Sequence, residues 1–274
     1  MSNSLLIKRK ISEFNKIISV SGDKSISIRW ILLASLGSGV SKAENLLISE
    51  DVKAAIDAVK KLGIKATMRG KFCKIYGNGI DGFKYKKNLI INAENSGTLG
   101  RLILGFLVNA NNPIKLIGDK SLSKRDFKRV SDPLGKFGAT LKLKNKKYLP
   151  LVIEGSNNLR PITYLEKKGS AQCKSSVIFA GLRTKGTTII KAKKSRNHTE
   201  LMCKYLGLPV SVKRKKNYDE IKVKKAKKIK PLNYRIPSDI SSGAFFIVLT
   251  ALSNNSKLLI KNVNINPSRI GIIT

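Results

Sequence analysis

A repeat of about seventy residues is the feature that most constrains what this chain can fold into. Three amphipathic segments each end in an apolar residue followed by glycine, and these glycines lie 75 and then 69 residues apart. Glycine directly after the last periodic apolar residue is typical of a helix C-terminus, because glycine adopts the left-handed conformation there without steric cost. We therefore expect a helix to end at each of Leu62-Gly63, Phe137-Gly138 and Leu206-Gly207.

A second set of segments is more apolar and alternates with the first. Each begins at a small polar residue or glycine and continues into an apolar run, as in Leu102–Val108. The starts are spaced by 72, 74 and 68 residues, and their apolar content predicts buried helices. These helices should start near Ser25, Gly97, Ala171 and Asp239.

Short β-prone runs connect the helices, so each repeat contains a buried helix, a strand, a surface helix and further strands. This order indicates an α/β fold. The predicted strands are Lys16–Val20, Leu89–Ile91, Ile114–Ile117, Leu151–Glu154, Thr187–Ile190 and Leu258–Ile260.

Three complete units fit between residues 21 and 236, and a fourth opens at Ser238. By analogy with the earlier units, the second helix of the fourth should lie near Ser268. Thr274 falls in the first turn of that helix, so the repeat predicts a C-terminally truncated chain. The severed unit should expose an apolar face that includes Phe245, Phe246 and Val248.

The charge of the chain is strongly positive, with 54 Lys and Arg against 17 Asp and Glu, a net charge of +37. Such an excess suits a nucleic-acid-binding protein, because phosphate backbones select basic surfaces. However, the lysines are spread along the whole chain, and aromatic residues make up only 6% of it, too few for an obvious base-stacking platform. A basic nucleic-acid-binding protein therefore stays an alternative, while anionic small molecules suit the same charge.

Several other classes of protein find little support. No stretch approaches the roughly 18 apolar residues of a membrane span, and the opening residues lack a secretory signal, which predicts a cytoplasmic protein. The three cysteines share no metal-type spacing, and His198 is the only histidine. A metal site or a Ser-His-Asp triad has little to rest on.

The start of the first buried helix has the chemistry of an anion site. A helix N-terminus offers unpaired N–H groups and the positive end of the macrodipole. Ser25 and Arg29 are four residues apart and hence on one helical face, and Lys24 lies at the start. A hydroxyl, an ammonium and a guanidinium together suit phosphate or carboxylate. The plain alternative is a capped helix with two solvated cations.

The later helix starts offer similar groups at matching positions of the repeat. Gly97 lets a ligand approach the backbone closely, and Ser170 and Gln172 stand at the third buried start. Arg125 and Arg196 occupy the starts of successive surface helices. Each residue alone fits a helix cap or a solvated charge, but their common register predicts a shared anion cleft.

These segments resemble signature motifs of the 3-phosphoshikimate 1-carboxyvinyltransferase (EPSP synthase) family, in order and over essentially the whole chain. The first and second helix starts are similar to the family's PGDKSIS-x-R and NAGT-x-x-R motifs. The others are similar to GD-x-SL-x-x-RP, SAQ-x-KS, SRDHTE and VPGD-x-SS. The matching segments are Ser21–Arg29, Asn95–Arg101, Gly118–Asp126, Ser170–Ser175, Ser195–Glu200 and Ile236–Ser242.

The resemblance implies an α/β fold of two domains, each built from three βαβαββ units. Residues 1–20 and 237–274 would belong to the incomplete first domain, and residues 21–236 would form the complete three-unit domain. The implied reaction transfers the enolpyruvyl group of phosphoenolpyruvate to the 5-hydroxyl of shikimate-3-phosphate, in aromatic amino acid biosynthesis. The resemblance implies no metal or organic cofactor, no nucleic-acid or membrane partner, and a monomer.

The resemblance also assigns site residues. Lys24 matches a catalytic position that reaches both substrates, whereas the family's acid/base carboxylates lie beyond the position of Thr274, so we expect the 274 residues alone to be inactive. The positions that match shikimate-3-phosphate contacts are Lys24, Ser25, Arg29, Ser170, Ala171, Gln172 and Arg196. Those that match phosphoenolpyruvate contacts are Lys24, Gly97, Arg125 and Gln172.

Some positions depart from the family pattern. Asp126 replaces a proline and is expected to compete for Arg125, and Asn197 replaces an aspartate. Ser21 and Ser238 replace a proline and a glycine. The nearest rival, the UDP-N-acetylglucosamine enolpyruvyl transferase family, opens with a Gly-Ala-Lys-Asn type signature, whereas this chain reads Gly-Asp-Lys-Ser from Gly22.

Overall fold

The structure is a computed structural model that describes residues 12–273. It is an α/β fold whose described residues fall into two compact units. The larger unit is Lys24–Ile236, and the smaller unit joins the residues up to Asp23 to those from Pro237 onward. No helix in the described part of the chain is long and apolar enough to cross a membrane.

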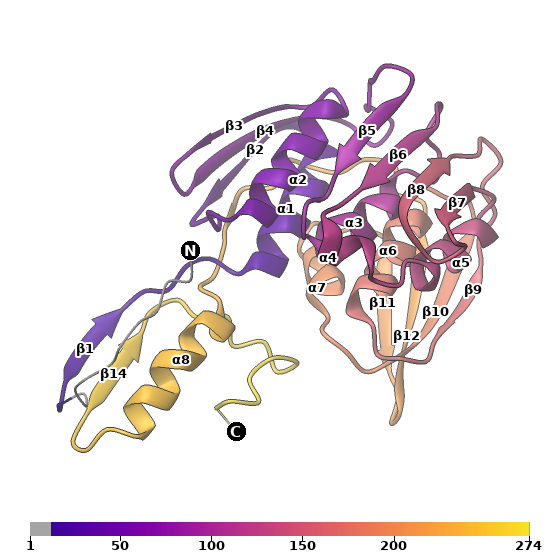
Figure 1. The fold of residues 1–274 in the computed structure, drawn as a ribbon. Helices are drawn as coiled ribbons and strands as arrows, with labels where there is room; N and C mark the ends of the chain where they lie inside the picture. Colours follow the sequence, from indigo (N-terminus) through magenta and orange to yellow (C-terminus); the bar gives the residue numbers. More distant parts are fainter. Residues whose placement is uncertain (1–11, 274) are drawn as a thin grey trace. The chain divides into compact units, whose positions relative to one another are not determined.

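The larger unit contains three four-stranded sheets that lie around its outside (Figure 1). The first, of order β13-β2-β4-β3, comprises β13 (Tyr234–Arg235), β2 (Ser38–Glu44), β4 (Phe72–Asn78) and β3 (Lys65–Arg69). The second, of order β5-β6-β8-β7, comprises β5 (Leu89–Asn92), β6 (Ile114–Ile117), β8 (Tyr148–Glu154) and β7 (Thr140–Lys144). The third, of order β11-β12-β10-β9, comprises β11 (Val210–Arg214), β12 (Tyr218–Lys224), β10 (Thr187–Lys193) and β9 (Thr163–Glu166).

The helices of this unit lie inside the sheets and confirm both predicted sets. The inner helices are α1 (Lys24–Ser35), α3 (Gly97–Phe106) and α6 (Ala171–Gly181). The second set is α2 (Glu50–Lys61), α5 (Lys128–Lys136) and α7 (His198–Tyr205), with a short α4 (Lys120–Ser123). Helices α2, α5 and α7 each end two residues before the predicted glycine, and those glycines have φ values of 85°, 111° and 63° (Gly63, Gly138 and Gly207).

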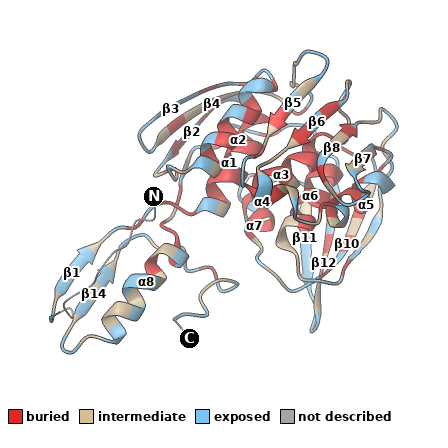
Figure 2. Cartoon of the chain, viewed as in Figure 1, coloured by how far each residue is buried: buried red, intermediate tan, exposed pale blue. Residues whose placement is uncertain are grey.

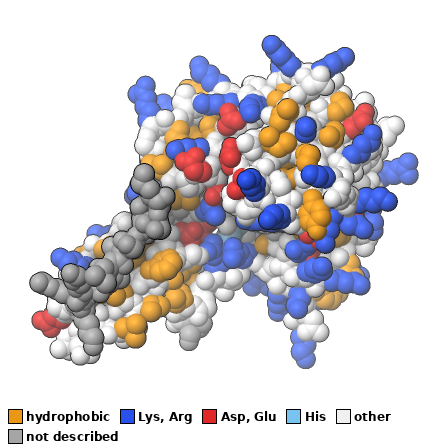
Figure 3. All heavy atoms as spheres, viewed as in Figure 1, with side chains coloured by type: hydrophobic (Ala, Val, Ile, Leu, Met, Phe, Trp, Pro, Cys, Tyr) orange, Lys and Arg blue, Asp and Glu red, His pale blue; other side chains and the backbone are white. Residues whose placement is uncertain are grey.

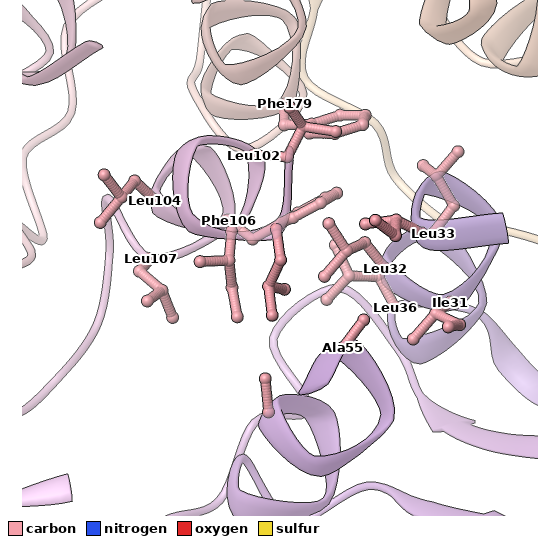
Figure 4. Packing of buried hydrophobic residues seen from close by; sticks show 14 of the residues in the cluster. Ile31, Leu32, Leu33, Leu36, Ala55, Leu102, Leu104, Phe106, Leu107 and Phe179 are labelled. Carbon is pink, nitrogen blue, oxygen red and sulfur yellow. The ribbon is translucent and has the colours of Figure 1, made fainter. Parts of the chain in front are cut away.

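The core of the larger unit lies where the inner helices meet (Figure 2). Phe106 of α3 stacks on Phe179 of α6, with ring centroids 4.2 Å apart. Leu32 of α1 and Leu36, which directly follows α1, approach the same cluster from another side, and Ala55 of α2 borders it (Figure 4). Side chains from three repeats therefore share one core.

The three repeats also exchange strands, so that they form a closed ring. Each sheet has one parallel pair, in which the strand that ends one unit joins the sheet of the next: β5 pairs with β6, and β9 with β10. The last strand, β13, pairs in parallel with β2 of the first unit. Side chains support this closure, because Trp30 Nε1 donates to Leu232 O at 2.9 Å and Leu232 N donates to Ser41 Oγ at 2.9 Å.

The smaller unit has a parallel pair of strands and one helix. Strand β1 (Asn15–Ile18) pairs with β14 (Lys257–Ile260), and α8 spans Ile240–Ala251 with Asp239 as its N-cap. The predicted exposed apolar face is confirmed, because Phe245, Phe246 and Val248 have exposed fractions of 79%, 42% and 48%.

The prediction of a second helix in the fourth repeat is wrong for the described residues. The chain near Ser268 forms turns, in which Arg269 N donates to Asn266 O and Ile273 N to Ile270 O, each at 2.8 Å. The Asn266 side chain accepts from both the backbone N and the Oγ of Ser268 at 2.9 Å. Such local side-chain bonds compete with helix formation.

Candidate functional site

Arg29 reaches helices α6 and α7 of the third repeat from the first turns of α1. Its Nε donates to Thr199 Oγ1 at 2.7 Å, its Nη2 to Ser175 Oγ at 3.1 Å and its Nη1 to Ser25 O at 2.9 Å. The residue is only 3% exposed. Arg29 is therefore held in a polar network, and the alternative of a solvated cation is wrong for it.

The hydroxyl groups around Arg29 tie α6 and α7 together. Thr199 Oγ1 donates to Ser175 Oγ at 2.6 Å, and Ser175 Oγ donates to Ala171 O at 2.6 Å. A buried ion pair joins the same two helices, with Lys174 Nζ 2.7 Å from Glu200 Oε1. These contacts fix the start of α7 against the first turns of α6, which rigidifies the surroundings of the guanidinium.

The other two residues at the start of α1 are more accessible. The side chain of Lys24 is 47% exposed, and its Nζ lies 3.6 Å from Asp51 Oδ2. Ser25 is half-buried. An exposed ion pair at this distance contributes little to stability, so the ammonium can change partners at low cost.

The start of α3 is flanked by two guanidinium groups. Ser96 caps this helix by accepting from Leu99 N at 3.2 Å, and Gly97 is buried in its first turn. A Cβ at Gly97 would lie 3.1 Å from Nη1 of both Arg101 and Arg125. Glycine thus leaves these two groups room beside the helix N-terminus, where backbone dipoles favour an anion.

Gln172 connects the start of α6 to the start of α3. Its Oε1 accepts from Arg101 Nη1 at 2.6 Å, and its Nε2 donates to Thr98 Oγ1 at 3.0 Å. Arg101 also stacks on Phe127, with its guanidinium carbon 5.2 Å from the ring centroid. The two helix starts are therefore joined through one amide.

The electrostatics of this region are those of a cation cluster. Burial lowers the pKa of the Arg101 guanidinium, the nearby charges of Arg129 and Arg125 also lower it, and Cys173 and Asp126 partly offset this by raising it. Neighbouring cations repel one another, and an anion that binds among them relieves this repulsion. The cluster is thus arranged for a negatively charged ligand.

Arg125 lies in the exposed connection after α4. Its Nη2 donates to Asn95 Oδ1 at 2.6 Å and lies 3.4 Å from Ser121 Oγ. The expected competition from Asp126 is not seen: over residues 12–273 no ion pair joins it to Arg125, and its Oδ1 accepts from Arg129 N at 3.3 Å.

The remaining predicted residues lie around the starts of α6 and α7. Ser170 caps α6 by accepting from Cys173 N at 3.3 Å, and its own N donates to Glu166 Oε2 at 2.8 Å. Ala171 is the first residue of α6 and is half-buried. Arg196 is exposed in the segment before α7.

The contacts gather the predicted residues into two groups that meet on α6. One group surrounds Arg29 and reaches α6 through Ser175, and the other surrounds Gly97 and reaches it through Gln172, one helical turn earlier. Lys24 forms its ion pair with Asp51 of α2, and Arg196 is exposed in the segment before α7. In the described part of the chain, no three His, Cys, Asp or Glu side chains are placed to hold a metal ion.

Four residues of these networks were not among the predicted site residues: Thr98, Arg101, Ser175 and Thr199. Arg101 follows Gly97 by four positions, as Arg29 follows Ser25, and it lies 72 residues after Arg29. The repeat spacing therefore held a signal for it. Thr199 had no such signal, because its role depends on a contact across 170 positions.

Comparisons with known proteins agree with this arrangement. The family model of EPSP synthase (3-phosphoshikimate 1-carboxyvinyltransferase) matches residues 8–274. The 3-phosphoshikimate 1-carboxyvinyltransferase of Caldicellulosiruptor bescii is 41% identical over 268 residues, which are 97% of this chain and 60% of the relative. That of Bacillus cytotoxicus is 38% identical over 267 residues, 97% of this chain and 62% of the relative.

A solved structure shows the same likeness in three dimensions. The EPSP synthase of Acinetobacter baumannii superposes with a TM-score of 0.88 at 33% sequence identity. The match covers 96% of this chain and 59% of that one. The chain thus spans about three fifths of the length of the relatives that it matches.

Proposed function

Because this chain belongs to the EPSP synthase (3-phosphoshikimate 1-carboxyvinyltransferase) family, we propose that it forms part of an enzyme that transfers the enolpyruvyl group of phosphoenolpyruvate to the 5-hydroxyl of shikimate-3-phosphate. The products are 5-enolpyruvylshikimate-3-phosphate and phosphate. The observation that carries the proposal is the pair of guanidinium groups beside Gly97, linked through Gln172 to the start of a second buried helix.

The phosphate and hydroxyl groups of shikimate-3-phosphate bind at the starts of α1 and α6. The exposed ammonium of Lys24 exchanges Asp51 for the anionic ligand, since that pair is long and solvated. Arg29, already fixed by Thr199 and Ser175, supplies a guanidinium whose position costs no further ordering on binding. Ser25, Ser170, Ala171, Gln172 and Arg196 complete this part of the site.

Phosphoenolpyruvate binds at the start of α3, against Gly97, Arg125 and Gln172, with Lys24 reaching it as well. Its phosphate and carboxylate suit guanidinium donors, which form charge-assisted and often bidentate hydrogen bonds. The half-buried Arg101 holds the Gln172 amide and adds positive charge beside the ligand.

The reaction requires the 5-hydroxyl to lose a proton while the methylene of phosphoenolpyruvate gains one, and the resulting tetrahedral intermediate expels phosphate. The residues of this chain bind and orient the two substrates and stabilise the charge that develops on the departing phosphate. Lys24 carries the catalytic part of this role. In the family, the acid/base carboxylates lie in segments beyond the position that corresponds to Thr274.

Further parts of the proposal concern the whole protein. Residues 1–20 and 237–274 belong to one domain, and residues 21–236 belong to the other. The enzyme acts as a cytoplasmic monomer without a metal or organic cofactor. Figure 3 supports small anions over nucleic acid as ligands, because Lys and Arg side chains are spread over the face in view and do not gather in one patch.

Substitution of Arg29 and Lys24 tests the site. Arg29→Ala should weaken shikimate-3-phosphate binding by about 1.5–3 kcal/mol, the usual scale for a charge-assisted hydrogen bond, which is roughly 10- to 150-fold in Kd. Lys24→Ala removes an exposed side chain, so a loss of affinity there is not caused by unfolding. Titration calorimetry measures both, with the exposed Arg235→Ala as a control of equal charge change. Unchanged affinity in both variants would refute the proposed site.

An activity assay tests the reaction itself. We expect that the 274 residues alone release no phosphate from the two substrates. After addition of a separate polypeptide that covers the remaining two fifths of a relative, we expect phosphate to be released. Turnover by the 274 residues alone would contradict the assignment of the acid/base groups.

A further inference from the structure

We propose that Asp119 is a positioning residue, which holds the Arg125 guanidinium in place by orienting the side-chain amide of Asn95. The inference rests on the proposed function insofar as Arg125 is taken to bind phosphoenolpyruvate. Three segments contribute: Asn95 precedes α3, Asp119 caps α4, and Arg125 follows α4.

Two hydrogen bonds connect the three side chains in series. Asn95 Nδ2 donates to Asp119 Oδ2 at 2.8 Å, and Arg125 Nη2 donates to Asn95 Oδ1 at 2.6 Å. The other nitrogen of the guanidinium, Nη1, lies 3.1 Å from the place of a Cβ on Gly97. The series therefore ends at the helix start where the anion binds.

The chemistry of the two end groups fixes the orientation of the amide between them. An ionised carboxylate only accepts hydrogen bonds, and a guanidinium only donates them. Asn95 must therefore turn its NH₂ group to Asp119 and its oxygen to Arg125. With a neutral amide at position 119, both orientations of Asn95 become possible, and one of them turns an NH₂ group toward the guanidinium.

The backbone holds the carboxylate and the amide in register. Asp119 Oδ1 accepts from Leu122 N at 2.6 Å, and Asp119 N donates to Glu94 O at 2.9 Å. On the other side, Asn92 Oδ1 accepts from Glu94 N at 3.0 Å. Both segments follow directly from β5 and β6, which pair in parallel up to Asn92 and Ile117. The separation of Asn95 and Asp119 is thus set by the sheet.

Arg125 needs such support because it is exposed. A free arginine side chain loses up to about 2 kcal/mol of rotamer entropy when a ligand fixes it. Because Asn95 stands between the carboxylate and the guanidinium, the side chain is ordered in advance while most of its donors stay available for an anion.

The test compares Asp119→Asn with Asp57→Asn in the 274-residue chain. Asparagine is a good helix N-cap, so the first variant keeps the α4 cap while it removes the group that can only accept. Asp57 is a 56%-exposed carboxylate on α2, paired with Lys61, and its variant makes the same charge change without touching Asn95.

The first readout is a pair of NMR signals recorded without ligand, the side-chain amide signals of Asn95 and the Nε–H signal of Arg125. The second readout is the affinity for phosphoenolpyruvate, measured with shikimate-3-phosphate present. We expect Asp119→Asn to shift both sets of signals and to weaken phosphoenolpyruvate binding roughly 3- to 10-fold, the scale of one hydrogen bond. Binding of shikimate-3-phosphate, and both readouts in Asp57→Asn, should stay at the wild-type value.

The outcomes separate this inference from the proposed function. Unchanged signals and unchanged affinity in Asp119→Asn would overturn the positioning role. If the wild-type chain does not bind phosphoenolpyruvate, the proposed function fails, and the ligand-free spectra still decide the role of Asp119: shifted Arg125 and Asn95 signals support it and unshifted signals overturn it.

Discussion

Helices α6 and α8 open the third and fourth repeats with similar apolar sequences, but they differ sharply in burial. Nine of the eleven residues of α6 are buried, whereas only Ile240 and Gly243 are buried among the twelve of α8. In α6, Phe179 stacks on a neighbouring helix and is fully buried. In α8, Phe245 has an exposed fraction of 79%, and Leu252, the C-cap residue of this helix, has one of 80%.

The difference shows what a single repeat lacks. Helix α6 lies against α3, α5 and α7 and against its own sheet, all within the larger unit. Within the smaller unit, α8 has β14 beside it, and among residues 12–273 the one strand that pairs with β14 is the short β1. An apolar helix is buried by its neighbours, so an apolar run contributes stability in one unit and exposed apolar surface in the other.

The largest expected effect is a difference between two phenylalanine substitutions. Phe179→Ala should lower the free energy of unfolding by about 3–5 kcal/mol, because it leaves a cavity beside Phe106. Phe245→Ala should change it by less than about 0.5 kcal/mol, as is usual for exposed positions. Urea unfolding followed by the fluorescence of buried Trp30 measures both. Equal losses in the two variants would abolish the contrast between the helices.

A glycine pair should give effects of opposite sign. A Cβ at Gly105 of α3 would lie 2.2 Å from Ser176 O, a backbone atom of α6, so Gly105→Ala should destabilise the larger unit by about 1–3 kcal/mol. At Gly243 of α8 the nearest atom is Ile260 Cδ1 at 3.4 Å. There alanine should stabilise the helix by up to about 1 kcal/mol through its higher helix propensity.

Amide hydrogen exchange in α3 and α8 resolves the two effects separately. Slower exchange in α8 of Gly243→Ala, together with faster exchange in α3 of Gly105→Ala, is the expected pattern. Protection gained by both variants would mean that α3 and α6 are not in close contact.

The smallest effect concerns thiol chemistry, which reports on the larger unit alone because Cys73, Cys173 and Cys203 all lie in it. Burial raises the pKa of the Cys73 thiol to about 11, and it also raises the pKa of Cys173 and Cys203. At pH 8 the thiolate fraction of Cys73 is then lower than that of an ordinary thiol by a factor of roughly 100.

Alkylation by iodoacetamide should accordingly be slow in the native chain at pH 8 and should accelerate when urea is added. Since the folded pKa of Cys73 lies above that of the unfolded chain, the unfolded state loses its proton first, and this contribution to stability falls as the pH rises from about 9 to about 11. Rapid alkylation of the native chain at pH 8 would contradict this expectation, because it would show that the buried thiols of the larger unit readily become accessible to solvent.

Much of the fold could be predicted from the sequence because its signals are local. Helix starts and ends depend on residues within one or two turns, and all six predicted strands overlap observed ones. The strands that were not predicted include β2, whose sequence SGVSKAE has one β-branched residue, and β11, whose sequence VSVKR is short and ends in two cationic residues. They form strands because neighbouring strands supply hydrogen bonds, and tertiary context overrides a weak local preference.

The candidate site divides in the same way. The spacing of Ser25 and Arg29 on one helical face is local, and so is the helix start at Gly97. The contact of Arg29 with Thr199 spans 170 positions, and that of Arg101 with Gln172 spans 71. Sequence patterns identify which groups have the right chemistry, and contacts between repeats decide which of them meet.

By itself, the sequence determined the repeat, the α/β class, the two sets of helices and the polar residues at their starts, because each depends on periodicity and capping within one unit. Only the tertiary structure decided that β13 closes the ring on β2 and that Arg29 is buried among hydroxyl groups. The physical reason is that pairing and burial are properties of neighbours brought together by the chain as a whole, and residues about 190 positions apart carry no local sign of each other.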